Sequence, residues 1–187
     1  MKRLLIALGL LTMATSALAI DTTRQAVRVG VLRGLHEEQN YVANMLRREL
    51  RERGIDAFDA RRTHLELLDD GAAVADYYVE VVGAEPSTTG YGGIDVGGEH
   101  GGISLGVFVS RIAAEVRVYD GESIELVATE DLAKKSTAIL PAGVGLGGRA
   151  LFAWVALPFI ERAQWRSVAR AAARDAAEAV AETLRGR

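Results

Sequence analysis

One group of residues with ligand-binding chemistry lies in a glycine-rich stretch, GYGGIDVGGEHGGISLG. Residues 90–106 include eight glycines in seventeen positions. Asp95, Glu99 and His100 fall within this stretch and offer carboxylate and imidazole groups that bind cations or small polar molecules. Their spacing matches neither His-x-His nor His-Glu-x-x-His, so no metal site is predicted and no cofactor is implied. Glycine in a strand interior costs backbone entropy, so we expect a mobile loop between two strands here.

A second group consists of aromatic side chains in and after an apolar segment, 138–160. Residues 140–160 read LPAGVGLGGRALFAWVALPFI, with one charge at Arg149. As a membrane span this segment would bury that charge at a cost of about 2.5 to 3.5 kcal/mol, so an integral membrane protein is not expected. Burial in the core or in a homo-oligomer is one interpretation, and a docking surface that contacts a protein or a membrane is the other. For a docking surface, the aromatic residues typical of interfaces are Phe152, Trp154, Phe159 and Trp165.

Two short motifs match catalytic or nucleotide-binding patterns only in form. The G-x-S-x-G around Ser104 follows a glycine stretch rather than a strand, and all three histidines precede it. The G-x-G-x-x-G at 143–148 lies late in the chain, not between a first strand and a first helix. No catalytic residue is therefore predicted, and the chain is not expected to be an enzyme.

The N-terminus has the pattern of an export signal. Lys2 and Arg3 precede an apolar run that ends in Ala-Leu-Ala at 17–19. We expect residues 1–19 to be a signal peptide cleaved after Ala19, which leaves a periplasmic chain, 20–187. This segment is short for a membrane span and is followed by polar residues.

The composition excludes several classes of protein. The absence of cysteine excludes disulfides, thiolate metal sites and lipidation at an N-terminal cysteine. Without Lys2 and Arg3, the 22 basic residues become 20 against 25 acidic ones, a net charge of −5. This balance does not favour nucleic acid as a partner.

The order of the expected elements is strand, helix, strand, helix, strand. Residues 26–32, 55–58 and 75–83 have strand patterns, and Val42, Met45, Leu46 and Leu50 recur at helical spacing. Gly54 ends that helix, and a short helix is expected at 61–70.

A hairpin and a terminal helix follow. Asp120-Gly121 favours a turn, with the left-handed conformation at Gly121 or its neighbour. A three-residue loop sets Val118 opposite Ile124, Val116 opposite Leu126 and Ala114 opposite Ala128. The terminal helix has a narrow apolar stripe and an Arg174–Glu178 pair; the stripe consists of Val168, Ala172, Ala176, Ala179, Val180 and Leu184. The sequence thus predicts a single α/β (α+β) domain, with a mixed sheet of about five strands and two or three helices packed on it.

This order of elements resembles a small α/β domain of bacterial envelope proteins. The matching pieces are VRVGVL, NYVANMLRRELRERG, IDAF, ADYYVEVVG, AAEVRVYDGESIELVATED and the terminal helix. The group includes the curli-secretion lipoproteins, the lipoprotein activators of penicillin-binding proteins, and the N-terminal domain of the Tol-Pal propeller protein. The resemblance implies a non-catalytic binding or assembly module whose partner is an envelope protein. The lipid-bearing cysteine of the lipoprotein members is missing here.

Three functions therefore remain as hypotheses. The first is an envelope module that acts through protein contacts or homo-oligomerisation, with peripheral membrane contact left open. The second is a periplasmic binder of a small ligand or cation at Asp95, Glu99 and His100. The third, an exported hydrolase, would require Ser104 to be essential for activity.

Overall fold

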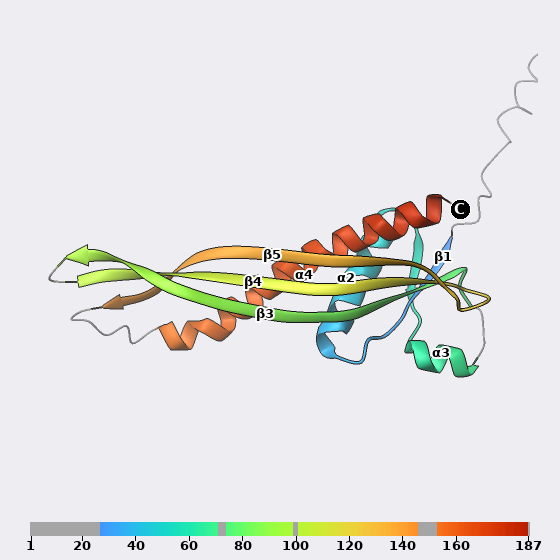
Figure 1. The fold of residues 1–187 in the computed structure, drawn as a ribbon, viewed down its shortest axis with the longest axis horizontal. Coiled ribbons are helices and arrows are strands. Elements are labelled where there is room, and N and C mark those ends of the chain that lie inside the picture. Colours follow the sequence, from blue (N-terminus) through green and yellow to red (C-terminus); the bar gives the residue numbers. More distant parts are fainter. Residues whose placement is uncertain (1–26, 71–73, 99–100, 146–152, 187) are drawn as a thin grey trace, which may run out of the picture.

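A computed structural model describes residues 27–70, 74–98, 101–145 and 153–186. They form one mixed sheet of five strands and three helices, which confirms the predicted α/β fold. The strand order is β2-β1-β3-β4-β5, with β1 parallel to β2 and β3, and with β3, β4 and β5 antiparallel (Figure 1). The elements are β1 (Arg28–Val31), α2 (Glu37–Glu52), β2 (Asp56–Asp59), α3 (His64–Asp70), β3 (Tyr77–Gly98), β4 (Gly101–Asp120), β5 (Leu126–Gly145) and α4 (Ala153–Arg185). The predicted signal peptide, 1–19, lies outside the described residues.

The β1-α2-β2 unit forms as its local sequence predicts. The backbone N–H of His36, the residue before α2, donates to Gln39 Oε1 at 3.1 Å in a capping box. Acidic Glu37 and Glu38 lie in the first turn, where their negative charges interact favourably with the positive end of the helix dipole. Gly54 adopts a left-handed φ of 79° just beyond the helix, which confirms the predicted helix end.

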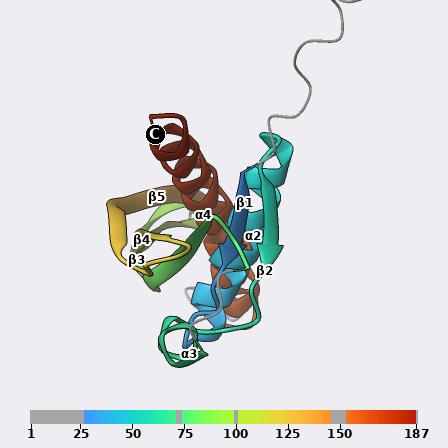
Figure 2. The same ribbon diagram turned by 90° about the vertical axis from the view of Figure 1, so that its right-hand side faces the viewer.

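The shorter helix α3 packs on the opposite face of the sheet from α2 (Figure 2) and lies at one end of the molecule (Figure 1). Thr63 and Glu66 form its capping box: the Thr63 N–H donates to Glu66 Oε2 at 2.7 Å. Leu67 is its buried apolar residue, whereas Leu65 and Leu68 are exposed. Leu67 packs in a small cluster with Leu32, Ala75, Tyr78 and Tyr119.

Strands β3, β4 and β5 extend well beyond the rest of the sheet as a three-stranded arm (Figure 1). At 20 to 22 residues each, these strands are about 65 Å long. The stretch 90–106, predicted as a mobile loop, is instead strand on both sides of positions 99–100, with Asp95 paired to Ser104. Pairing of β4 with both neighbours satisfies its backbone groups, and this outweighs the entropy cost of the glycines.

The apolar segment 138–160, which is one unit in the prediction from sequence, belongs to two elements. Residues 138–145 continue β5, and residues 153–160 form the start of α4. Residues 146–152, between these parts, lie outside the described residues.

The β4–β5 hairpin forms as predicted, but in a different register. Val118 pairs with Ala128 rather than Ile124, and Ala114 pairs with Leu132 rather than Ala128. The predicted three-residue loop and the left-handed residue at or beside Gly121 are both wrong. The turn spans residues 121–125, with the left-handed φ of 57° at Ile124.

Local hydrogen bonds explain the longer turn. Asp120 Oδ1 accepts the backbone N–H groups of Glu122 and Ser123 at 3.0 and 2.9 Å. The Gly121 N–H donates to the Asp76 carbonyl at 2.8 Å, so a contact with the chain entering β3 fixes this glycine. The dipeptide alone carries no sign of that contact.

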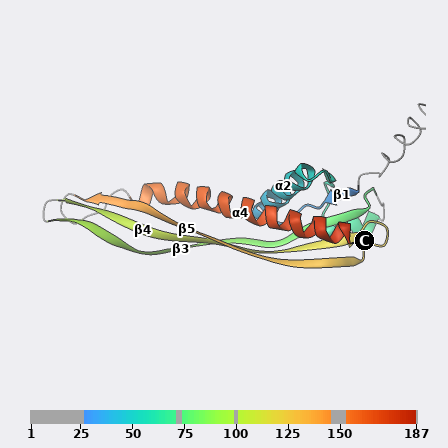
Figure 3. The same cartoon turned by 90° about the horizontal axis from the view of Figure 1, so that it is seen from above.

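Helices α2 and α4 lie side by side on one face of the sheet and enclose the main core (Figure 3). The buried surface of α4 is wider than the predicted stripe because the helix contacts both α2 and the sheet. Ala179 and Leu184 of the predicted stripe are only partly buried. The buried apolar residues in the described part of α4 are Val168, Ala169, Ala172, Ala173, Ala176, Ala177, Val180 and Ala181.

Polar contacts tie α4 to its neighbours. Arg174, predicted to pair with Glu178, has its Nε 3.8 Å from Glu49 Oε2 on α2 instead. Lys134 on β5 forms an ion pair with Asp175 on α4. These contacts connect α4 with both the arm and α2.

The arm face turned away from α4 is exposed and mostly polar near the base of the arm, whereas Ile139, farther along β5, is an exposed apolar residue. Successive strand residues point to opposite faces, and the exposed side chains on this face are Glu85, Ser87, Thr89, Arg111, Ala113, Ala133, Lys135 and Thr137. This pattern is typical of an antiparallel sheet that packs on one face and is solvated on the other.

Tyr119 makes the stability of the folded chain sensitive to alkaline pH. Its hydroxyl donates to Glu80 Oε2 at 2.9 Å, and its ring stacks on His64 with 4.3 Å between centroids. Burial, and then the bond to Glu80, raise the pKa of Tyr119 to about 12. An unfolded tyrosine has a pKa of about 10, so this stabilisation is complete below pH 10 and is lost as the pH rises through 12.

We therefore expect the free energy of unfolding of the wild type to fall between pH 10 and 12. The free energy of unfolding of Tyr119→Phe should fall less steeply over the same range. Urea unfolding at several pH values measures both slopes. If the unfolding free energy of the variant fell as steeply with pH as that of the wild type, the loss of stability at alkaline pH would come from groups other than Tyr119.

Candidate binding sites

A groove of about 570 Å³ lies where α2, β3 and α4 meet. Both polar and aromatic residues line it, and they come from three elements distant in sequence. Its lining residues are Glu37, Glu38, Tyr41, Pro86, Thr88, Arg162, Trp165 and Arg166. We call it the Trp165 groove.

Trp165, one of the four predicted partner-binding residues, forms an aromatic wall of this groove with Tyr41. The two ring centroids are 4.7 Å apart, with the planes tilted by 46°. Trp165 Nε1 is buried and has no hydrogen-bond acceptor among the residues that the structure describes. A buried indole N–H normally has a hydrogen-bond partner, so this unsatisfied donor is an unusual feature of the groove wall.

Gln164, the residue before Trp165, lies in a buried polar chain under α4. Its Oε1 accepts the Ser110 hydroxyl at 2.8 Å, and Ser110 Oγ lies 3.1 Å from Thr88 Oγ1. Gln164 Nε2 is buried and, within the described part of the chain, also has no hydrogen-bond acceptor. Gln164 and Trp165, which are consecutive in sequence, thus each have a buried donor without an acceptor among the described residues.

The walls of the Trp165 groove carry charges of both signs. Glu37 and Glu38 come from the first turn of α2, while Arg162 and Arg166 come from α4. A complementary surface would therefore present both acidic and basic groups, and its charge pattern would fix its orientation.

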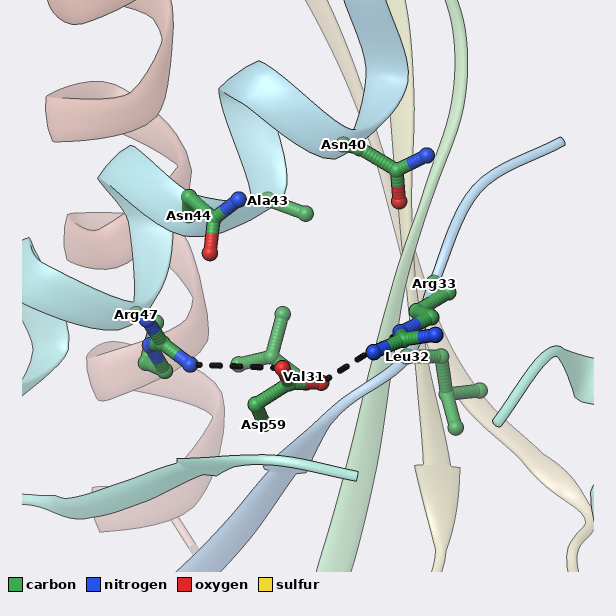
Figure 4. Close-up of a pocket in the computed structure, with 8 residues that line it drawn as sticks. All are labelled: Val31, Leu32, Arg33, Asn40, Ala43, Asn44, Arg47 and Asp59. Carbon is green, nitrogen blue, oxygen red and sulfur yellow. Dashed lines mark ion pairs between the residues drawn. The ribbon is translucent and has the colours of Figure 1, made fainter. Parts of the chain in front are cut away.

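A second cavity, of about 240 Å³, lies at the carboxyl ends of β1 and β2. Figure 4 shows Asp59 between Arg33 and Arg47, below the amides of Asn40 and Asn44. The remaining lining residues are Val31, Leu32 and Ala43. We call it the arginine pocket.

The connections of the sheet explain the position of this pocket. The chain leaves β1 toward α2 on one face, and leaves β2 toward α3 on the other. Where adjacent parallel strands send their connections to opposite faces, a crevice opens at their carboxyl ends. Arg33 follows β1 and Asp59 ends β2, so both lie at this crevice.

Electrostatic contacts in the arginine pocket are loose. Arg33 Nε is 3.9 Å from Asp59 Oδ1, and Arg47 Nη1 is 3.7 Å from Asp59 Oδ2. Both distances exceed those of hydrogen bonds. Nearby Glu66 has a lowered pKa, first because the Thr63 backbone donates a hydrogen bond to it, and further because Arg33 and Arg62 are close.

For the other predicted site residues, the structure gives at most the position of the backbone. Asp95 lies on β3, seven residues beyond Thr88, which corresponds to about 23 Å along the strand. Trp154 and Phe159 lie in the first part of α4, and Trp154 is eleven residues, or about 16 Å of helix, from Trp165. Glu99, His100 and Phe152 lie outside the described residues.

The described residues contain little that matches catalytic or metal-binding geometry. Ser104 is in the interior of β4 and pairs with Asp95 and Gly143, so its backbone is not a strand-turn-helix elbow. No three His, Cys, Asp or Glu residues in the described ranges are grouped to hold a metal ion. No helix in those ranges has the length and apolar character to cross a membrane.

The sequence interpretation missed Arg33, Arg47 and Asp59. A signal for the pocket was present, since polar residues stand at the ends of the first two strands, in VGVLR and IDAFD. Consecutive strands joined by a helix are parallel and bring their carboxyl ends to one edge.

Comparisons with known proteins identify no family for this chain. No protein-family model matches it, and no curated protein matches its sequence. Among solved structures, a putative lipoprotein from Caulobacter crescentus is 12% identical, with a TM-score of 0.41, over 81% of this chain and 83% of its own. A minor lipoprotein from Acinetobacter baumannii is 10% identical, with a TM-score of 0.38, over 82% and 86%. Lipoprotein GNA1162 from Neisseria meningitidis is 13% identical, with a TM-score of 0.37, over 73% and 97%.

Proposed function

We propose that this chain is a non-catalytic binding module of the bacterial cell envelope that docks a protein partner in the Trp165 groove. The observation that carries this proposal is the aromatic pair of Tyr41 and Trp165, which lines the groove beside two arginines of α4. Tryptophan and arginine are enriched at the energetic centres of protein interfaces. The groove has both, at Trp165, Arg162 and Arg166.

The size and shape of the surroundings favour a protein over a small molecule. The groove opens between a helix pair and the start of a long strand arm, so a partner that fills it can also contact α4 and the arm. Stable protein interfaces bury about 800 Å² on each side, which an elongated surface of this kind offers. The groove is lined by residues of α4 and α2, so we place docking on the side of the sheet that α4 covers.

The proposed envelope location depends on the N-terminal sequence. The signal-like residues 1–19 support export, and the absence of cysteine in the chain supports a form without a lipid anchor. Peripheral contact with a membrane through the aromatic part of α4 remains part of the proposal.

Site-specific cross-linking in intact cells tests the groove. A photoreactive phenylalanine analogue in place of Arg166 is expected to give one discrete adduct, either with another envelope protein or with a second copy of this chain. The same analogue in place of Glu178, an exposed residue of α4 outside the groove, should not give it. Trp165→Ala should reduce the adduct at least tenfold, because truncating a central tryptophan typically costs 2 kcal/mol or more, as an order of magnitude.

Trp165→Phe separates the two contributions of this side chain. It retains a ring beside Tyr41 and removes the N–H donor, so we expect a loss smaller than that of Trp165→Ala. An adduct that persists in both variants, or that also forms from position 178, would refute docking in the groove. Circular dichroism of both variants establishes that they remain folded.

A further inference from the structure

We propose that the arginine pocket binds the phosphate group of a small phosphorylated molecule, with Arg33 and Arg47 as its ligands. This site is separate from the Trp165 groove, because the two cavities share no lining residue. The proposal therefore does not depend on the proposed function.

The arginine pocket lies where ligands commonly bind in open α/β sheets. The pocket lies at the point where the connections after β1 and β2 depart to opposite faces of the sheet. In open α/β sheets, ligands bind in the crevice at such switch points, outside the carboxyl ends of the strands. Its volume of about 240 Å³ is slightly below the range of about 300 to 1,000 Å³ typical of ligand pockets, so it suits a compact group.

The loop after β1 is held in place by the side chain of Asn40. The Asn40 side chain accepts the Gly34 N–H at 3.0 Å and donates to the Gly34 carbonyl at 3.1 Å. This pair of bonds fixes the backbone next to Arg33. The Asn40 amide thus orders the pocket from α2, the same helix that supplies Arg47 and Asn44.

The charged side chains of the arginine pocket favour an anionic ligand. Two guanidinium groups from different elements face one carboxylate, so the three side chains have a net charge of +1. Guanidinium groups present forked donors that match phosphate oxygens. Loose, partly exposed ion pairs contribute little to stability, so turning both arginines from Asp59 toward a ligand costs little.

The choice of phosphate follows from competition with Asp59. A ligand carboxylate would replace one monoanion by another and gain little. A phosphate dianion can pair with both arginines at once and offers more acceptor oxygens. A cation is disfavoured because two positive side chains line the same pocket.

Asp59 then holds the arginines in place when the pocket is empty. Its Oδ1 accepts the Arg61 N–H at 2.8 Å, so the carboxylate is fixed by the backbone and does not follow the arginines. Asp59→Asn keeps an oxygen for this bond but removes the competing charge.

Titration of the full chain with inorganic phosphate at pH 8, at constant ionic strength, tests this proposal by calorimetry and by ligand-induced stabilisation. We expect Arg33→Gln and Arg47→Gln each to weaken phosphate binding about tenfold, the value of one charge-assisted contact. Asp59→Asn should bind phosphate more tightly than the wild type. Arg48→Gln is the matched control, because it removes an exposed arginine of α2 outside the pocket and should leave binding unchanged.

Phosphate binding that is absent in the wild type, equally weakened by Arg48→Gln, or weakened by Asp59→Asn would overturn the proposal. Glycerol 3-phosphate and vesicles containing phosphatidic acid carry the same group on a soluble molecule and on a lipid. Binding of the soluble ester that depends on both arginines supports a soluble ligand. Binding to the vesicles but not to glycerol 3-phosphate would overturn the proposal of a small phosphorylated ligand.

Discussion

Gly121→Ala is expected to lower the free energy of unfolding by about 3 kcal/mol or more, because nearby backbone occupies the space that a side chain needs. A Cβ at this position would lie 1.9 Å from the Ala75 carbonyl oxygen and 2.7 Å from the Asp76 carbonyl carbon. The variant must move the hairpin away from the chain entering β3, and this also strains the hydrogen bond from the Gly121 N–H to Asp76. Urea denaturation of the variant and the wild type measures the difference.

Gly54→Ala is the matched control. Gly54 has a φ of 79°, but nothing lies within 4 Å of an added Cβ. Its replacement therefore costs only the left-handed conformation, about 1 to 2 kcal/mol. A smaller loss at position 121 than at position 54 would show that the hairpin does not pack closely on residues 75–76.

Leu46→Ala is expected to lower the free energy of unfolding by about 2 to 5 kcal/mol, through lost burial and the cavity that remains. Leu46 is fully buried on α2, in the core that α2 and α4 enclose against the sheet. The closely packed alanines of α4 offer few flexible side chains to fill the space. Thermal and urea unfolding both measure this loss.

Leu65→Ala tests whether burial is the cause. Leu65, on α3, is 68% exposed, so the same chemical change should alter the free energy of unfolding by less than about 0.5 kcal/mol. Equal losses at positions 46 and 65 would contradict a core between α2 and α4.

The β1-α2-β2 part of the fold was predictable because its signals are local. Apolar spacing placed Val42, Leu46 and Leu50 on one buried face of α2, and Gly54 ended the helix as expected. Each of these signals depends on residues within one or two turns of helix.

The arm was not predictable because its pairing depends on distant strands. Local entropy argues against a strand through the glycines at 90–106, and only pairing with β5 on the far side of β4 completes that ladder. The hairpin register was wrong for a similar reason. Gly121 is held by Asp76, more than forty positions earlier, so a turn rule applied to Asp120-Gly121 could not find the actual loop.

The candidate sites were predictable only in part. Trp165 was singled out for its residue type, but its partner Tyr41 lies on another helix and had no distinguishing feature in the sequence. Arg33 and Asp59 meet because parallel strands align their carboxyl ends, and Arg47 joins them because α2 crosses above. These three residues meet only because of the order and direction of the strands and the helix, which residue types alone do not reveal.

Helix α4 has a mechanical consequence. It runs unbroken for 33 residues, about 50 Å, and is joined to the arm through Lys134–Asp175 and to α2 through Arg174–Glu49. The stronger connection is apolar, because buried valines and alanines of α4 pack against residues of both α2 and the arm strands. A molecule bound to α4 would therefore be held at a fixed position relative to the base of the arm.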